Sequence, residues 1–402
     1  MLPAEPIGLN TSMNQPASPP RSSSPLPLPL QSQSQSQSLL PTSLSSPPSF
    51  RPPDSLPSLP QALASGQPDP DAFPTFGIAA GASYLPPLRR PLAHWAAAAG
   101  PAARALLPAM QANGLAHYHV APELDVEGLA EAAVQRLLDE GGFVPAEVGR
   151  VIFCHAGTLS TMAAPVSMPA QLMKRFGMHR AVGHSISQQN CASVVGALRL
   201  VRSLMWRHRL LDDVLIVAAD KVHGEPHRNV GAYAIQSDGA LALLLRRNHP
   251  RNRIGHIAFT LDSRYYRGVA KSAELGQRYV LNYPLLAHRM LSQVMQASGW
   301  RPEEVDAVLP MNANLSAFRR VMELLGLPRD KLHERNIGEV GHVFCCDPFA
   351  NFLERFAMPE AVSSGNALLF ASATSGVFCA LGISRAWTGA IDAPPWAAKE
   401  VI

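Results

Sequence analysis

Apolar residues along the chain fall into short runs that alternate between strand-like and helix-like spacing. Leu129–Asp139 (LAEAAVQRLLD) has apolar residues at helical spacing, whereas Val214–Ala219 (VLIVAA) is a continuous apolar run typical of a strand covered on both faces. The same patterns predict further strands at residues 76–86, 151–154, 181–187, 240–245, 254–260, 307–310, 367–371 and 377–383. They predict further helices at residues 92–112, 170–176, 192–207, 284–298, 315–325 and after Asp347.

Strands alternate with helices in two comparable stretches, which predicts an α/β fold with layered sheets. We therefore divide the chain into a first half at residues 75–248 and a second half at residues 249–402. Residues 1–74 contain the tracts SPLPLPL and QSQSQSQS, a composition that cannot bury enough apolar surface to fold. We expect this segment to be a disordered tail, with a docking segment or a wrongly assigned start as open alternatives.

Composition narrows the class of protein. The chain has 402 residues, of which 47% are hydrophobic and 16% charged, as in a globular enzyme-sized protein. The net charge of +4 comes from scattered arginines, and aromatic residues make up only 6%, so a nucleic-acid surface is not expected. Residues 367–383 are interrupted by polar residues and Gly376, which predicts two buried strands around a turn and no membrane span.

The cysteines and small motifs argue against cofactors and disulfides. Five cysteines form an odd set with no CxxC pattern and no secretory leader, which indicates reduced thiols in a cytoplasmic setting. The interval His223–His227 contains Gly224 and Pro226, which prevent the helix that a zinc pair at this spacing needs. No GxxxxGK[ST] or GxGxxG loop is present, so no nucleotide cofactor is expected.

The most informative segment is Gly183–Leu198 (GHSISQQNCASVVGAL), in which an apolar strand leads through small polar residues to Cys191 and then to a helix. A thiol at this corner lies at a helix N-terminus, where the macrodipole and free N–H groups stabilise a thiolate. The same amides can hold an acyl oxyanion. Cys191 is therefore the candidate nucleophile, against the alternative of a small buried residue.

The region from about Phe76 to Arg385 resembles the β-ketoacyl synthase III branch of the thiolase superfamily. The matching segments are GASYLP, QQNCAS, SDGALALLL, PMNANLSA and ATSGVFCALGI, in the family's order. The resemblance implies a thiolase-like fold with two similar halves in an α-β-α-β-α arrangement. It also implies that Cys191 accepts the acyl group and that the backbone near Ser375 and Gly376, which matches a glycine-rich turn, helps to form an oxyanion hole.

The sequence departs from this family at both remaining catalytic positions. Met311 stands where the family's HQAN motif has histidine, and His342 stands where its GNTS motif has asparagine. His342 is the candidate base, against a packed core histidine. Asp347 is a candidate to orient it, against the alternative of a helix N-cap before a proline. Asn314 matches the asparagine of HQAN and is either catalytic or structural.

One imidazole beside a thiolate suits simple acyl transfer, whereas the family's decarboxylative condensation uses two groups to stabilise an enolate. We therefore predict an acyltransferase of fatty-acid or polyketide-type, specialised metabolism, with Met311, Ser375 and Gly376 at the substrate site. A condensing synthase and a non-catalytic partner subunit remain alternatives. The resemblance implies a homodimer and an acyl donor bound to coenzyme A or acyl carrier protein. The carrier protein is favoured, because the family's coenzyme A segments DEWI and RTGI are not recognisable here.

Overall fold

The computed structural model describes residues 74–157, 166–357 and 365–386. All of them lie in one compact unit, Pro60–Ile402. The predicted tail at residues 1–74 falls outside the described residues except for its last one, so its disorder stays a prediction.

A single sheet of nine strands runs through the described residues, in the order β11-β12-β13-β10-β1-β9-β6-β4-β5. Its first part along the chain comprises β1 (Phe76–Tyr84), β4 (Val148–Cys154), β5 (Val182–Ile186), β6 (Asp213–Asp220) and β9 (Gly239–Arg247). Its second part comprises β10 (Arg251–Leu261), β11 (Val305–Leu309), β12 (Asn366–Ser372) and β13 (Val377–Ala386). The predicted division of the chain after residue 248 falls between these parts and stays a prediction.

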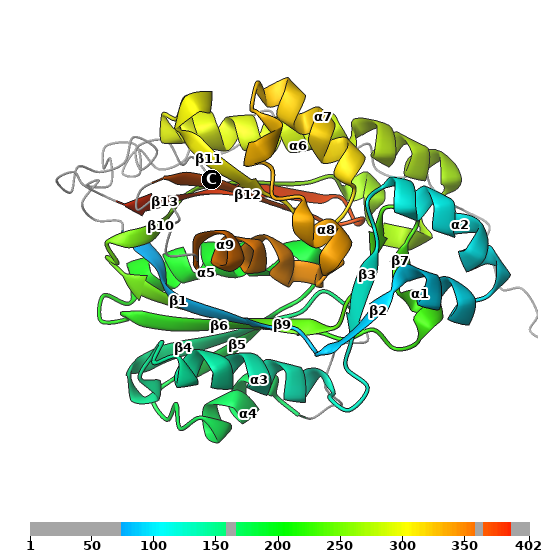
Figure 1. Ribbon diagram of the computed structural model, residues 1–402. Helices are drawn as coiled ribbons and strands as arrows, with labels where there is room; N and C mark the ends of the chain where they lie inside the picture. Colours follow the sequence, from blue (N-terminus) through cyan, green and yellow to red (C-terminus); the bar gives the residue numbers. More distant parts are fainter. Residues whose placement is uncertain (1–73, 158–165, 358–364, 387–402) are drawn as a thin grey trace, which may run out of the picture. The chain divides into compact units, whose positions relative to one another are not determined.

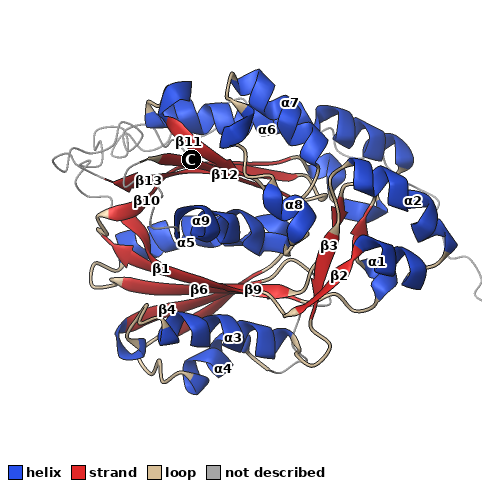
Figure 2. Cartoon of the chain, in the orientation of Figure 1, coloured by secondary structure: helices blue, strands red, loops and turns tan. Residues whose placement is uncertain are grey.

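The two parts of the sheet lie one above the other with helices between and outside them (Figure 1). The middle layer holds α5 (Ser193–Arg207) and α9 (Asp347–Ala357), while α3 (Val126–Asp139) and α4 (Met168–Arg175) cover one outer face. The other outer face is covered by α6 (Ala273–Ser298) and α7 (Leu315–Leu325). Figure 2 shows the same alternation of helices and strands by colour. The predicted α-β-α-β-α arrangement is confirmed.

The two parts of the sheet join at one narrow point. The only register position between β1 and β10 in the described sheet pairs Gly77 with Arg253. A Cβ added at Gly77 would lie 2.4 Å from the carbonyl oxygen of Arg251, so a side chain here would push the strands apart. From this joint the two parts diverge and enclose the middle helices, whose apolar residues share one core with both.

Smaller elements complete the fold at one end of the sheet. They are β2 (Leu88–Pro91), α1 (Leu92–Ala98), α2 (Pro101–Ala112), β3 (His117–Val120), β7 (Asn229–Val230), β8 (Ala234–Ile235) and α8 (Arg335–Glu339). Strands β2 and β3 pair with each other, as do β7 and β8. Two short 3₁₀ turns, η4 (Asn190–Ala192) and η10 (Phe344–Cys346), immediately precede α5 and α9.

Two predicted helices have other bounds than expected. The helix predicted at residues 92–112 is two helices, because Gly100 has a φ of +95° and Pro101 starts a new helix at its first position. The helix predicted from Pro284 begins earlier, at Ala273, where Ser272 caps it by accepting a hydrogen bond from the N–H of Leu275. Pro284 lies inside this long helix, which continues on both sides of it.

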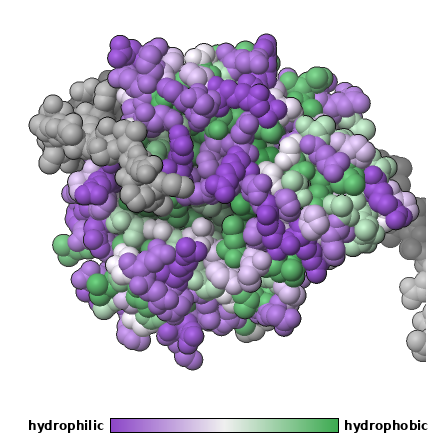
Figure 3. Space-filling model, in the orientation of Figure 1, coloured by the Kyte–Doolittle hydropathy of each residue, from purple (hydrophilic) through white to green (hydrophobic). Residues whose placement is uncertain are grey.

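Strands β12 and β13 form the predicted pair around a tight turn, so this apolar segment is strand and not a membrane helix. Within the described residues, no helix has the length and apolar character that crossing a membrane requires. Hydrophilic side chains are prominent over the outer helices in Figure 3, as expected for helices that bury only one face.

Candidate active site

Cys191 lies at the corner between β5 and α5 that the sequence predicts. Strand β5 ends at Ile186, and Cys191 is the middle residue of η4, directly before α5 begins. Asn190 has a left-handed φ of +51°, a conformation that asparagine tolerates better than most residues. The hydroxyl of Ser193 is within 2.8 Å of the carbonyl oxygens of Ser187 and Asn190, which ties the corner together. Cys191 is half-buried, while the other four cysteines are buried.

His342 and Asp347 come from the second half of the chain. His342 lies between Cys191 and Asp347 and contacts both. The Sγ of Cys191 is 3.2 Å from Nε2 of His342. On the other side of the ring, Nδ1 of His342 donates a hydrogen bond of 2.5 Å to Oδ2 of Asp347. Asp347 is the first residue of α9, and its carboxylate accepts hydrogen bonds from Val343 and Asn312, outside the helix. These contacts are the ones expected of a carboxylate that orients the imidazole, and the two roles weighed for Asp347 stay predictions.

The electrostatics of this line favour a charged imidazole. Burial alone would lower the pKa of His342, but the adjacent Asp347 carboxylate and the Cys191 thiolate raise the pKa well above its usual value. His342 is 3% exposed and Asp347 is fully buried. In these surroundings, with little water to screen charge, the raised pKa means that His342 holds a proton more tightly, and the short distance between Sγ and Nε2 suits proton transfer between sulfur and nitrogen.

The backbone of His342 is held between neighbouring segments. Its N–H donates to the carbonyl of Ile235, and its carbonyl accepts from the N–H of Ser237, at 2.8 and 2.9 Å. Gly341 precedes it with a φ of +78°, and a Cβ at Gly341 would meet Ile235 O, Ser237 Oγ and His117 O at 2.8 to 3.1 Å. A glycine is therefore needed here for His342 to reach the site.

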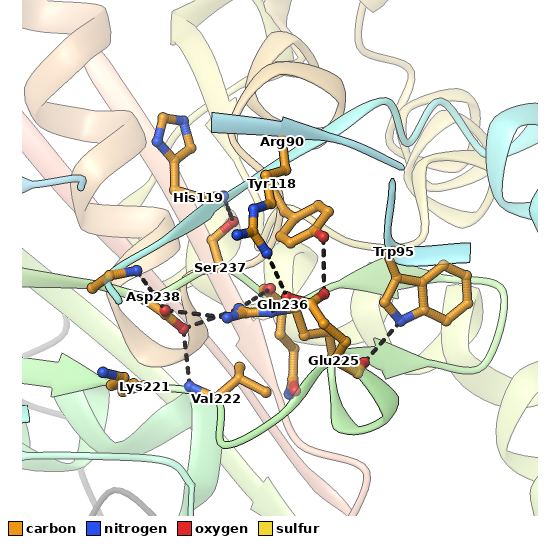
Figure 4. A network of polar contacts seen from close by, with 12 residues as sticks. Arg90, Trp95, Tyr118, His119, Lys221, Val222, Glu225, Gln236, Ser237 and Asp238 are labelled. Atoms are coloured by element: carbon orange, nitrogen blue, oxygen red, sulfur yellow. Dashed lines mark hydrogen bonds and ion pairs between the residues drawn. The ribbon is translucent and has the colours of Figure 1, made fainter. Parts of the chain in front are cut away.

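A buried polar network surrounds Ser237 and Asp238 (Figure 4). Ser237 is the residue whose N–H donates to the carbonyl of His342. The carboxylate of Asp238 accepts hydrogen bonds from the N–H groups of Ala121 and Val222 and from both terminal nitrogens of Arg228. Glu225 accepts from Tyr118 Oη at 2.8 Å and pairs with Arg90 and Arg228, while its carbonyl accepts from Trp95. These contacts attach α1, β2 and β3 to the loop beside the base. Burial and Glu225 raise the pKa of the Tyr118 hydroxyl.

The predicted oxyanion turn lies between β12 and β13. Strands β12 and β13 both contact η4, which carries Cys191. The N–H of Gly376 donates to the carbonyl of Ala373 at 2.9 Å, so this amide is already used within the turn. The backbone amide of Ser375 stays a predicted oxyanion donor. Separately, the Oγ of Ser375 is buried and has no hydrogen-bond partner among the described residues.

Met311, which stands where the sequence resemblance predicts a histidine, has a side chain that cannot act as a base. It is buried, and its sulfur accepts a hydrogen bond of 3.3 Å from the N–H of Ser372. A thioether does not take up or donate a proton at neutral pH. The described site therefore has one imidazole beside Cys191, that of His342.

Two asparagines precede α7, and a contact with the carboxylate of Asp347 is seen for Asn312, while the role of the Asn314 side chain stays a prediction. Asn314 precedes α7 with a left-handed φ of +55°, and its carbonyl accepts from the N–H groups of Ala317 and Phe318. Its backbone thus starts the helix, which is a structural role. Asn312, two residues earlier, donates to Asp347 through its backbone N–H and its side-chain amide, at 2.8 and 3.2 Å. The sequence analysis did not single out Asn312.

Comparisons with known proteins agree with this architecture. Similar solved structures include the acyltransferase ChlB3, with 17% identity, a TM-score of 0.67 and coverage of 80% of this chain and 100% of that one. The 3-oxoacyl-(acyl carrier protein) synthase III of Pseudomonas aeruginosa PAO1 has 19% identity, a TM-score of 0.65 and coverage of 79% and 100%. The priming β-ketosynthase of the R1128 polyketide pathway has 18% identity, a TM-score of 0.63 and coverage of 78% and 97%. The chain therefore has the thiolase-like fold of these condensing enzymes and acyltransferases.

A family model makes the match more specific for part of the chain. Residues 295–385 match the model of the 3-oxoacyl-[acyl-carrier-protein (ACP)] synthase III C-terminal domain. None of the curated protein sequences matches the chain. The family model confirms the resemblance to the β-ketoacyl synthase III group over this segment, and the solved structures confirm the predicted fold.

Proposed function

We propose that the protein is an acyltransferase that forms an acyl thioester on Cys191 and passes the acyl group to a second substrate. The observation that carries this proposal is the line from the sulfur of Cys191 to the imidazole of His342, 3.2 Å away, and on to the carboxylate of Asp347. A cysteine beside a base that is itself oriented by a third group is the arrangement that activates a nucleophile.

The first half-reaction loads the enzyme. His342 takes the thiol proton, and the thiolate of Cys191 attacks the carbonyl carbon of an acyl thioester. The oxyanion of the tetrahedral intermediate is stabilised by amides at the start of α5 and by the turn at Ser375. The bond between the acyl carbon and the donor sulfur then breaks, and His342 returns the proton to the departing thiolate.

The second half-reaction unloads it. His342 takes a proton from an alcohol, amine or thiol acceptor as that group attacks the acyl carbon on Cys191. The thioester bond to Cys191 breaks, and the imidazolium protonates the sulfur. Asp347 accepts the hydrogen bond from Nδ1 of His342 and keeps the ring in place in both half-reactions.

Simple transfer is favoured over condensation by the side chain at residue 311. Condensation with a malonyl thioester generates an enolate, which two hydrogen-bonding groups stabilise in the family that the sequence resembles. Here the sulfur of Met311 already accepts a hydrogen bond from the backbone of Ser372. His342 alone serves the base function of transfer.

The proposal includes a substrate class and a setting. The donor is an acyl thioester of acyl carrier protein or coenzyme A, and the similar solved structures carry names of acyl-carrier-protein synthases and of a polyketide priming enzyme. We extend the proposal to a homodimer in specialised, polyketide-type or fatty-acid metabolism. All five cysteines are free thiols, which fits a reducing compartment such as the cytoplasm.

Intact-mass measurement after incubation with acyl thioesters tests the proposal. We expect a mass increase equal to the acyl group on the wild type and on the control variant Cys379→Ala, which removes a buried thiol of β13. The variant Cys191→Ala should gain no mass. If short, medium and malonyl donors all leave the wild type unchanged, both enzyme hypotheses fail and the non-catalytic partner subunit remains. Stoichiometric release of carbon dioxide from malonyl thioester would instead establish condensation.

A further inference from the structure

A row of buried asparagine side chains leads away from Asp347. Asn312 donates to Oδ2 of Asp347 through its backbone N–H and to Oδ1 through Nδ2, and the same Nδ2 is 2.9 Å from the carbonyl of Gly341. One asparagine therefore contacts both oxygens of the carboxylate that orients His342. It also holds the backbone directly before His342.

The next asparagine sets the orientation of this amide. Asn351, on α9, donates through Nδ2 to Oδ1 of Asn312 at 3.0 Å and to the carbonyl of Pro310 at 2.9 Å. Because Oδ1 of Asn312 accepts from Asn351, its Nδ2 must point toward Asp347 and Gly341. An amide turned the other way would place two NH₂ groups face to face.

A third asparagine, Asn336, links Asn351 to Glu354. Nδ2 of Asn336, on α8, donates to Oδ1 of Asn351 at 2.9 Å and to Oε2 of Glu354 at 2.6 Å. Asn312, Asn336 and Asn351 are 2%, 5% and 0% exposed. Each amide has its nitrogen and oxygen distinguished by its partners, so the donors point in one direction from Asn336 through Asn351 and Asn312 to Asp347, while Asn336 also donates to Glu354.

The three amides form part of the wall of a cavity of about 340 Å³. The wall also includes Val343 and Cys346, the first and last residues of the segment between His342 and Asp347. Solvent can therefore approach this side of the triad, yet Asp347 is fully buried. The amide of Asn312 gives the carboxylate hydrogen bonds while the row keeps it away from the water of the cavity.

We propose that Asn312 is a positioning residue of the active site, which holds the carboxylate of Asp347 in place and aimed at His342 and thereby sets the reactivity of Cys191. The inference rests on the proposed role of the triad and deepens it. Hydrogen bonds to a buried carboxylate stabilise its charged form, and the charged form is what supports an imidazolium. Asn351 supports the same function indirectly, because it fixes the amide of Asn312.

A pH profile of Cys191 alkylation by iodoacetamide tests this role without any acyl donor. The rate of carbamidomethylation at Cys191 is followed by peptide mass spectrometry between pH 5 and pH 9. In Asn312→Leu we expect the midpoint of the profile to rise by about one pH unit and the rate at neutral pH to fall roughly tenfold, the scale of one hydrogen bond to a charged group. Asn351→Leu leaves Asp347 its direct donors and should shift the midpoint in the same direction by less.

The control is Glu140→Gln, which changes a side chain on the wall of the same cavity that pairs with Arg136. It should leave the profile unchanged. If the two asparagine variants melt at lower temperature but keep the wild-type profile, the asparagines only support the fold and the proposal is overturned. Because alkylation needs no acyl transfer, a wild type that never forms an acyl adduct would refute the proposed function while this test still decides the role of Asn312.

Discussion

Replacing Asp347 with asparagine probes both the folding and the chemistry of the site. In the structure, Oδ1 of Asp347 accepts from the N–H of Val343 and from Nδ2 of Asn312, at 2.7 and 3.2 Å. Oδ2 accepts from Nδ1 of His342 and from the N–H of Asn312, at 2.5 and 2.8 Å. All four partners of the carboxylate are therefore donors.

An amide cannot satisfy this set in either orientation. Whichever oxygen of Asp347 becomes NH₂, two donors of the surrounding protein then face another donor. At about 1–3 kcal/mol for each buried group left without a partner, Asp347→Asn should lose roughly 2–6 kcal/mol of unfolding free energy. Acylation should fall by about 10³- to 10⁴-fold, because His342 loses its anionic partner and the tautomer that the carboxylate selects.

Urea unfolding and the rate of acyl-adduct formation on Cys191 check the two effects. The control is Asp139→Asn at the end of α3, whose carboxylate accepts from Gln135 on the surface. The control should change stability by less than about 0.5 kcal/mol and leave acylation unchanged. If Asp347→Asn acylates within tenfold of the wild-type rate and is equally stable, the carboxylate neither orients the base nor supports its charge.

Two further predictions concern the base and the backbone that carries it. Because the pKa of His342 is raised in the folded protein, its stabilising contribution is complete below about pH 6.5, the ordinary histidine value, and is lost as pH rises toward the raised value. Melting temperature should therefore fall more steeply from pH 6.5 to pH 9 in the wild type than in His342→Gln, and parallel curves would contradict this. Gly341→Ala should cost roughly 1–3 kcal/mol more than Gly299→Ala, since both glycines have positive φ but only Gly341 lacks room for a Cβ. Equal melting temperatures for the two variants would show that the contacts around Gly341 relax freely.

Local patterns predicted most of the described helices and strands. Helix α7 has the predicted bounds, Leu315–Leu325, because its apolar residues keep a helical period up to the glycine that ends it. The helix break at Gly100 and Pro101 was missed, although both residues are visible in the sequence, because alanine favours a helix on either side of them. The early start of α6 was missed because Pro284 was taken as a start signal, whereas Ser272 supplies the cap.

Sequence motifs predicted the three residues that lie in line at the site, but not the row of asparagine side chains that leads to Asp347. Cys191, His342 and Asp347 were singled out from a strand-helix corner and from family-like segments, and the structure brings them into one line. Asn312 was missed because the resemblance directed attention to Asn314, and nothing local distinguishes two asparagines two residues apart. Its partner Asn351 lies 39 positions further along the chain, and Asn336, which contacts Asn351, precedes that residue by 15 positions, so only the folded structure reveals that the amides meet.

The proposed transfer mechanism needs one imidazole, that of His342, which lies between Cys191 and Asp347. The two middle helices each begin beside His342: η4, with Cys191, precedes α5, and Asp347 is the first residue of α9. Helix N-termini carry partial positive charge that stabilises nearby anions, so both helix starts favour negative charge beside the ring. The two nitrogens of His342 face Cys191 and Asp347, and these neighbours raise its pKa. In the proposed transfer this ring exchanges a proton with sulfur or with an acceptor. An enolate would need the second donor that Met311 does not provide.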